Sequence, residues 1–215
     1  MATGDYSTYD EITEGVKQNL NRTDLDDNIP TFIRLAEKRI YRSMRLPINE
    51  RTVDTDITGD APFFTIPTDY LESFQFYDSG GHVIQRIQLQ QFLSYSPTAG
   101  GLRPVLVTRK DMTFAFWPPC DTTITHTYYF EPSPLSSSNQ SNEVSHVAGE
   151  LILMASIAEG WRYVRNEEKL VLYSEMYNGI FEELNKQWRD DETSGSTMIA
   201  GNPYQGDSVT PVERA

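Results

Sequence analysis

One short acidic run has the spacing of the first ligands of a calcium-binding loop. Asp24, Asp26 and Asn28 occupy alternate positions, as the first three ligands of an EF-hand do. The sixth position of such a loop needs Gly and the twelfth needs Glu, but here these positions are Ile29 and Leu35. The run cannot close a calcium cage, and we interpret it as an acidic turn and helix cap.

A second acidic run fits the same motif more closely. Asp54 and Asp56 have the ligand spacing, and the sixth position of this loop is Gly59. The twelfth position is Thr65, which cannot supply the bidentate carboxylate that the motif requires. We interpret this run too as an acidic turn, and we expect no metal site in it.

Glu143 and His146 match half of the ligand set of a di-iron bundle. Such a site needs a second Glu-x-x-His, yet neither His82 nor His126 has Glu three residues before it.

The single Cys120 excludes an intrachain disulfide and a cysteine-cluster metal site. The chain has no phosphate-binding glycine loop, no Gly-x-Ser-x-Gly elbow and no His-Glu-x-x-His pair. The sequence therefore predicts no catalytic residues, no bound metal and no cofactor.

One charged stripe stands out on the helix expected over residues 28–45. Its members are Arg34, Lys38, Arg42 and Arg45. They lie about 180° from the centre of the helix's apolar face. The stripe is either a solvated face, with an ion pair to Glu37 or to a neighbouring element, or a contact for an acidic partner, including a second copy of the chain. A contact with duplex DNA is a weaker interpretation, because few basic groups are concentrated here.

The balance of charge limits the partners of the chain. Its 215 residues include 18 basic and 31 acidic side chains, which gives a net charge of −13. This acidity argues against sequence-independent binding of duplex DNA and against anionic membranes. The longest apolar stretch, residues 151–158, is far too short to span a bilayer, so we expect no membrane partner.

Hydrophobic periodicity predicts the helices that position these residues. Apolar side chains recur at helical spacing from Ser7, a plausible N-cap, to about residue 20, and again over residues 28–45. Two more helices are expected over residues 144–165 and 167–188. The third of the four is apolar nearly all round, which indicates a helix at the centre of a bundle.

The middle of the chain has a different pattern. Between residues 63 and 130, short β-branched and aromatic segments alternate with Gly, Pro and Asp turns, which predicts a small antiparallel sheet of hairpins. Residues 88–94 are expected to form a short helix within it. The fold class is therefore α+β, a bundle of N- and C-terminal helices with an inserted sheet and an extended C-terminal arm. The expected parts are 1–48, 49–142, 143–189 and 190–215.

The C-terminal segment from Asp190 has no periodicity, but it keeps isolated apolar and proline residues. They are Met198, Ile199, Pro203, Tyr204, Val209, Pro211 and Val212. The segment is either a frayed terminus or an extended strap whose anchors dock one by one on a partner.

Several of these segments resemble the head-to-tail adaptor (connector) proteins of tailed bacteriophages, of the short-tailed type. The resemblance is carried by Asn21-Arg22-Thr23-Asp24-Leu25 and by the following helix, which contains Ala36-Glu37-Lys38-Arg39-Ile40-Tyr41-Arg42. Ile66-Pro67-Thr68-Asp69-Tyr70-Leu71, the Tyr128-Tyr129 pair and the helix after Glu150 extend it, in order, over about residues 6–188.

The resemblance implies a non-enzymatic structural protein of the virion, made in the host cytoplasm and placed at the head–tail junction. Such adaptors form a homo-oligomeric ring, commonly of twelve copies, beneath the portal protein. The arm would run along the portal, and a tail or nozzle protein would dock on the opposite side. DNA would pass through the ring only as a transient passenger. The basic stripe would contact a neighbouring subunit or the portal.

Two functions of other classes stay open from the residues alone. A soluble hydrolase could use a carboxylate pair that the sequence does not reveal, and a concave pocket with convergent acids would favour it. A monomeric module could hold a small ligand or sugar on its sheet, and a broad cleft lined by aromatic residues would favour that function.

Overall fold

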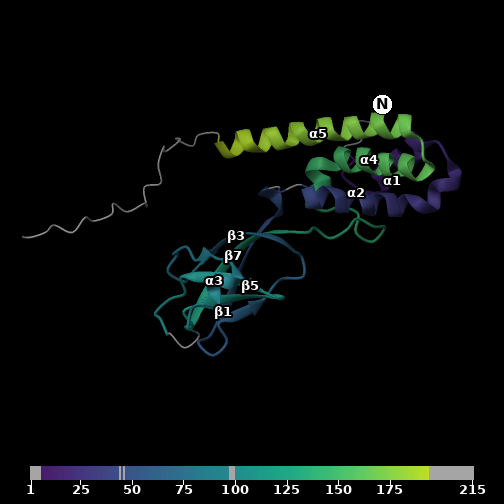
Figure 1. Cartoon of the computed structure of the whole chain (residues 1–215). Coiled ribbons are helices and arrows are strands. Elements are labelled where there is room, and N and C mark those ends of the chain that lie inside the picture. The colour runs from purple at the N-terminus through teal and green to yellow at the C-terminus, as the bar shows by residue number, and fades with distance from the viewer. Residues whose placement is uncertain (1–5, 44, 46, 97–99, 194–215) are drawn as a thin grey trace, which may run out of the picture.

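A computed structural model describes residues 6–43, 45, 47–96 and 100–193 (Figure 1). It confirms the α+β class, because a bundle of helices carries an inserted region of strands. The helices are α1 (Tyr9–Leu20), α2 (Ile29–Ser43), α3 (Leu89–Phe92), α4 (Glu143–Val164) and α5 (Glu167–Thr193), with 3-10 helices at Thr23–Asn28 and Pro47–Asn49. The strands are β1 (Glu50–Ile57), β2 (Phe63–Thr65), β3 (Tyr70–Tyr77), β4 (Gln85–Arg86), β5 (Leu106–Lys110), β6 (Thr113–Trp117) and β7 (Thr122–Phe130).

Helix α4 is the centre of the bundle. It packs against α1, α2 and α5, and in Figure 1 it lies between α2 and α5. Its side chains Leu151, Ile152 and Leu153 point in different directions around the helix, yet none is more than 1% exposed. Full burial of such a side chain contributes about 1.5–3 kcal/mol, so burial on every side of α4 is a large part of what stabilises the bundle. The prediction of a central helix is confirmed.

The helices approach each other closely where glycine lies between them. A Cβ atom on Gly160 would lie 2.8 Å from Leu20 Cδ1 and 2.9 Å from its Cδ2, and one on Gly15 would lie 2.9 Å from Leu153 Cδ1. Contacts of that length are repulsive, so a side chain at either glycine would force the facing leucine to move.

The N-termini of α1 and α4 are each fixed by a capping box. Thr8, rather than the expected Ser7, is the N-cap of α1: its hydroxyl accepts the N–H of Glu11, whose carboxylate accepts the N–H of Thr8. The second box satisfies the free N–H groups of α4 through Asn142 and Ser145.

The inserted strands form two sheets, not the single antiparallel sheet that the sequence suggests. One has the order β1-β7-β3, and the other has the order β2-β6-β5-β4, in which β4 and β5 pair in parallel. The inner faces of the two sheets bury each other's apolar side chains. Phe114 and Phe116 of β6 meet Phe76 of β3, with ring centroids 5.0 and 5.9 Å apart. A single flat sheet would leave this apolar face exposed to water, whereas two packed sheets bury their apolar faces against each other.

Strand β1 was missing from the sequence-based prediction, which placed an acidic turn at residues 54–59. Asp54 and Asp56 instead belong to the strand and lie opposite Thr125 and Thr123 of β7. Each aspartate accepts a hydrogen bond of 2.7 Å from the threonine hydroxyl that it faces. The strand forms because its polar side chains are paired across the ladder, on a face that needs no apolar residues.

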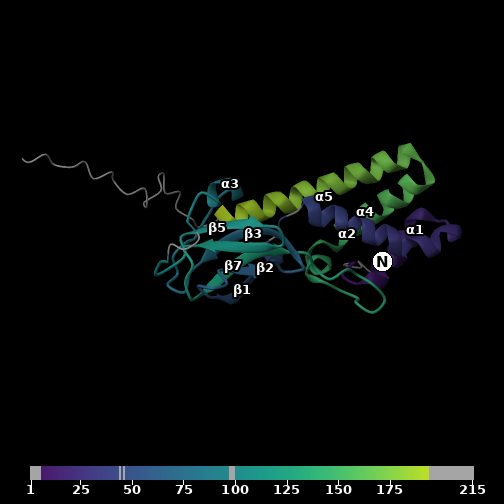
Figure 2. The ribbon, with the colours of Figure 1, turned by 60° about the horizontal axis from the view of Figure 1, so that its bottom comes forward.

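The chain passes between bundle and sheets twice, from α2 to β1 and from β7 to α4. Figure 2, turned by 60°, again shows the bundle and the sheets as neighbouring bodies, with the C-terminal end of α5 extending beyond α4. The loop expected at residues 132–142 is present and contains only an isolated bridge between Ser136 and Asn139. Helix α5 continues to Thr193, so the first residues of the expected arm are helical.

Candidate functional site

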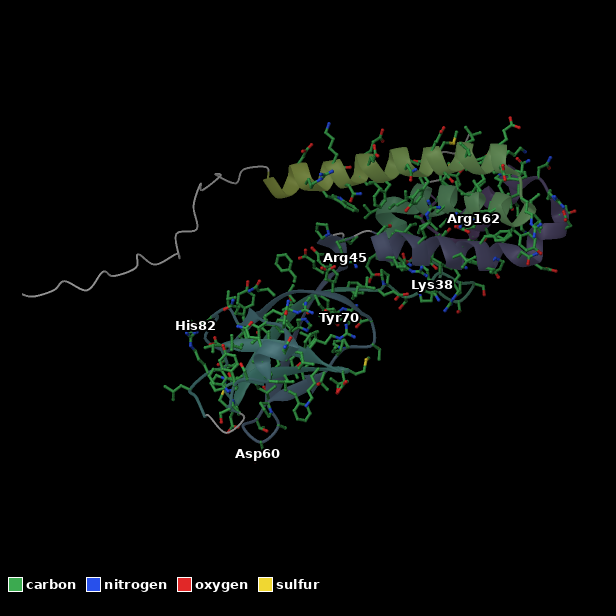
Figure 3. The ribbon with its side chains drawn as sticks, viewed as in Figure 1. Lys38, Arg45, Asp60, Tyr70, His82 and Arg162 are labelled. Atoms are coloured by element: carbon green, nitrogen blue, oxygen red, sulfur yellow. The ribbon has the colours of Figure 1, made fainter. Side chains whose placement is uncertain are left out.

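Three members of the predicted basic stripe lie on the surface of α2. Arg34, Lys38 and Arg42 are exposed, and Figure 3 shows Lys38 on the side of α2 turned away from α5. Within the described part of the chain, Lys38 and Arg42 have no ion-pair partner. These cations are therefore available to a partner.

The fourth member, Arg45, has a different environment. It is half-buried, and its Nε donates to Glu72 Oε2 on β3 at 2.8 Å. Its Nη1 also donates to the carbonyl oxygen of Tyr41 at 2.9 Å. Arg45 thus joins the end of α2 to the three-stranded sheet, and its position is structural.

A groove of about 460 Å³ runs beside the stripe, between α2 and α4. It is lined by Leu35, Arg39 and Arg42 from α2 and by Glu159 and Arg162 from α4. Three guanidinium groups surround one carboxylate, so the groove is positive although the chain as a whole carries a charge of −13. Guanidinium groups in this arrangement match the planar geometry of an incoming carboxylate.

Contacts with partly buried neighbours hold the charged side chains of the groove in place. Glu159 is 7% exposed, and both of its oxygens accept from Arg162 Nη1, at 2.7 and 2.8 Å. The Arg39 guanidinium lies 3.9 Å from Glu159 Oε1 and 4.4 Å from the ring centre of Tyr177 on α5. Arg39 Nη1 is buried and has no hydrogen-bond acceptor within the described residues. Its charge is balanced by Glu159 at ion-pair distance, without a hydrogen bond.

The position of Glu37 differs from the expectation of an ion-pair partner on the solvated face of α2. Its side chain is only 1% exposed. Its carboxylate accepts hydrogen bonds from the Tyr41 hydroxyl at 3.0 Å, from Leu135 N–H at 3.0 Å and from Asn142 Nδ2 at 3.1 Å. Burial raises the pKa of Glu37, and these donors act in the opposite direction. At 100° per residue, Glu37 lies only about 40° from Ile33, which is the signal that could have placed it inside.

Within the described residues, no group of three or more metal-binding side chains converges. Asp24 belongs to the 3-10 helix and pairs with Arg22, whose Nη2 is 2.7 Å from its Oδ2. Glu143 and His146 are both exposed at the start of α4. These positions agree with the interpretation of both motifs as ordinary caps and surface residues.

The environments of Cys120, His82 and His126 do not favour action as a nucleophile or as a base. Burial, followed by the charges of Asp121 and Asp78, raises the pKa of the Cys120 thiol, which disfavours the reactive thiolate. His82 Nδ1 lies 3.0 Å from Asp78 Oδ1, but the same oxygen also accepts the backbone N–H groups of Gly80 and His82. Asp78 therefore closes a turn. Burial lowers the pKa of His126 to about 4.

The pocket beside β4 and α3 favours neither of the two other functions. A pocket of about 780 Å³ beside β4 and α3 is lined by Gln, Arg, Ile, Leu and Thr, and no carboxylate contributes to it. Phe64 and Phe116 are packed against each other in the interior of the sheets, with ring centroids 5.5 Å apart, whereas Phe63 on β2 and Phe74 on β3 are 51% and 59% exposed. No helix in the described part of the chain is long and apolar enough to cross a membrane.

The predicted anchors of the C-terminal arm lie outside the described residues. They are Met198, Ile199, Pro203, Tyr204, Val209, Pro211 and Val212. The arm therefore stays a prediction from the sequence, except that its first residues extend α5.

The described residues combine a helical bundle, an inserted β region and a positive surface groove in a strongly acidic chain. The sequence model of the family described as SU10 adaptor protein matches residues 7–200, and the chain belongs to this family. It is thus a structural bacteriophage protein of the head–tail adaptor type, as the resemblance implied. No curated protein sequence matches the chain significantly.

Proposed function

We propose that this protein forms a ring of twelve copies that joins the portal of a short-tailed phage to its tail and continues the DNA channel. Membership of the adaptor family carries this proposal. In this function the chain is made in the host cytoplasm and binds the portal on one side and a tail or nozzle protein on the other. It performs no catalysis.

The bundle is the part suited to building a ring. It is held by one continuous core around α4, so it can bear contacts on several sides without rearranging. Its basic stripe and groove supply charge for a neighbouring subunit or for the portal. The sheets form a second core of their own, which leaves them free to meet the tail.

The arm supplies attachment to the portal through many weak contacts. Each copy contributes one strap with a few apolar anchors, and the ring couples the straps so that avidity replaces individual affinity.

The acidity of the chain suits a conduit. A ring of chains that each carry −13 repels DNA phosphates, and a wall that does not bind DNA lets it pass. This part of the proposal requires acidic residues on the channel-facing surface.

The direct test is a chain that ends at Thr193, which keeps the whole of α5 and removes the arm. We expect it to melt within about 2 °C of the full chain and to lose co-sedimentation with portal rings. Electron microscopy of portal mixed with the full chain should show an added ring. Full-strength docking of the shortened chain would refute the role of the arm, and absence of a ring with the full chain would refute the adaptor function.

A further inference from the structure

We infer that the groove between α2 and α4 binds the acidic outer face of α5 from a second copy of this chain. The inference rests on the proposed ring and names the two surfaces that would build it. Its acceptor is the groove formed by Leu35, Arg39, Arg42, Glu159 and Arg162, which we call the α2–α4 groove.

The donor surface is the side of α5 that faces away from α4. With buried Tyr177 taken as the centre of the inner face, a period of 3.6 residues turns four carboxylates outward. They are Glu168, Glu175, Glu182 and Glu183, all exposed. None of the four has an ion-pair partner in the part of the chain that the structure describes. This side of α5 is therefore an unneutralised acidic surface, interrupted by Lys186.

The two surfaces complement each other in charge. The α2–α4 groove has three guanidinium groups against one carboxylate, and Lys38 adds a further exposed cation beside it. Within the described residues, the Arg39 charge faces only Glu159 Oε1, 3.9 Å from its Nη1, and Arg162 shares the same carboxylate, so the groove keeps an excess of positive charge. Charge complementarity of this kind selects the orientation of two chains and suppresses wrong pairings.

Apolar side chains accompany the charges on both surfaces. Leu35 is 47% exposed in the groove, and Val171, Leu172 and Met176 on α5 are between 46% and 55% exposed. Burial of these side chains against each other would add hydrophobic free energy that charge pairs at a surface do not supply.

The geometry makes the contact head-to-tail. Figure 1 shows α5 along one border of the bundle and α2 along the other, and Figure 3 shows Arg162 between them and Lys38 on the border away from α5. Because donor and acceptor are different patches of one molecule, each copy offers one of each. Such heterologous contacts close into a ring or continue as a filament, whereas a two-fold dimer would use one patch twice.

Charge reversal on each surface tests the pairing. The groove variant is Lys38→Glu/Arg42→Glu, and the α5 variant is Glu175→Lys/Glu182→Lys. We expect each variant alone to raise the concentration needed for half-maximal ring assembly on portal by about tenfold or more, since like charges then face each other. An equimolar mixture of the two variants should assemble again, because every contact between unlike chains is complementary. A single chain with all four substitutions should assemble as well.

A steric variant gives an independent readout. A Cβ atom on Gly179, on the outer face of α5, meets nothing within 4 Å. Gly179→Trp should therefore leave the melting temperature of the monomer within about 2 °C and block ring assembly. The control is Lys110→Glu, an exposed charge reversal on β5 that we expect to change nothing.

The outcomes separate this inference from the proposed function. If wild type assembles on portal and either charge-reversed variant assembles equally well, or the mixture fails to recover, the α2–α4 groove does not bind α5. A groove variant that loses only binding to a DNA duplex would also overturn the inference. If wild type forms no ring on portal, it is the adaptor function that fails.

Discussion

Asn142 Nδ2 donates a hydrogen bond of 3.1 Å to Glu37 Oε1, although 105 residues separate them in the chain. Asn142 caps α4, and Glu37 lies in the middle of α2. The same amide nitrogen lies 3.0 Å from the Tyr41 hydroxyl and 2.9 Å from the carbonyl oxygen of Ser133. One buried carboxylate therefore fixes the N-terminus of the central helix, the second helix and the loop that returns from the sheets.

Replacing Glu37 by Ala should destabilise the protein by about 2–4 kcal/mol, because it leaves buried donors of Tyr41, Leu135 and Asn142 without their acceptor. Urea unfolding followed by far-UV circular dichroism measures the change. Lys38→Ala, on the exposed side of the same helix, is the matched control and should alter stability by less than about 0.5 kcal/mol. Equal effects of the two substitutions would contradict the structural role of Glu37.

Stability should fall as pH decreases from about 6.5 towards 4, through His126. Burial, and then the charge of Arg86, lowers its pKa from 6.5 to about 4. The unfolded state binds the proton more tightly, so the contribution is complete above pH 6.5 and is lost as pH falls to the folded pKa. Between pH 7 and about pH 4.5 the free energy of unfolding of wild type should drop by about 2–3 kcal/mol relative to His126→Phe.

The same comparison for His146→Gln provides the control, because that histidine is exposed. The drop relative to His126→Phe should persist in a chain that also carries His146→Gln. A wild-type curve that runs parallel to that of His126→Phe would show that His126 titrates normally.

Two glycine substitutions should have opposite effects on stability. Gly160→Ala places a Cβ atom 2.8 Å from Leu20 Cδ1, and we expect it to cost about 1–3 kcal/mol. Gly179→Ala meets open space on α5 and should stabilise the helix by up to about 1 kcal/mol. Thermal unfolding of the two variants beside wild type decides this. A Gly160→Ala protein as stable as Gly179→Ala would mean that α1 and α4 are not in close contact.

Substitutions of Arg45 and of Lys38 should have different effects, although the sequence predicts that both residues belong to one basic stripe. Arg45→Ala removes the ion pair with Glu72 and the hydrogen bond to the Tyr41 carbonyl oxygen. It should lower the melting temperature slightly, with ring assembly retained, since an ion pair open to solvent contributes about 0.2–1 kcal/mol. Lys38→Glu should leave the melting temperature unchanged and weaken assembly. Sedimentation with portal and differential scanning calorimetry together report both properties. The reverse pattern would place the contact surface at Arg45.

The helices were predictable because the sequence patterns that determine them lie within each helix. The apolar spacing of α2 and the all-round apolar character of α4 determine which sides are buried, and both predictions are confirmed. The fold class follows from the same patterns, since helical periodicity at both ends encloses a region rich in β-branched and aromatic residues.

The strand pairing was not predictable in the same way, because it depends on distant residues. All residues of β1 except Thr55 and Ile57 are exposed, so the strand lacks the apolar alternation by which strands are recognised. Its aspartates look like a turn until Thr123 and Thr125, far along the chain, are placed opposite them. The division into two sheets likewise depends on which aromatic faces meet.

The candidate surface was predicted only in part. The charges of Arg34, Lys38 and Arg42 follow from the helix period alone. Arg39 and Arg162 were not singled out, because the groove exists only when α2 and α4 lie side by side.

The two connections between bundle and sheets determine how a mechanical load would travel through the molecule. A pull on the sheets reaches the bundle along one covalent path into the end of α2, beside Arg45, and along another into the loop before α4. The second path ends at the N–H of Leu135 and the amide of Asn142, both held by Glu37 inside the bundle. Tension on the sheets is therefore spread over several buried hydrogen bonds at once, which resists rupture better than peeling a helix from one end. In the proposed ring, this arrangement would let the bundle carry load that is applied to the sheets.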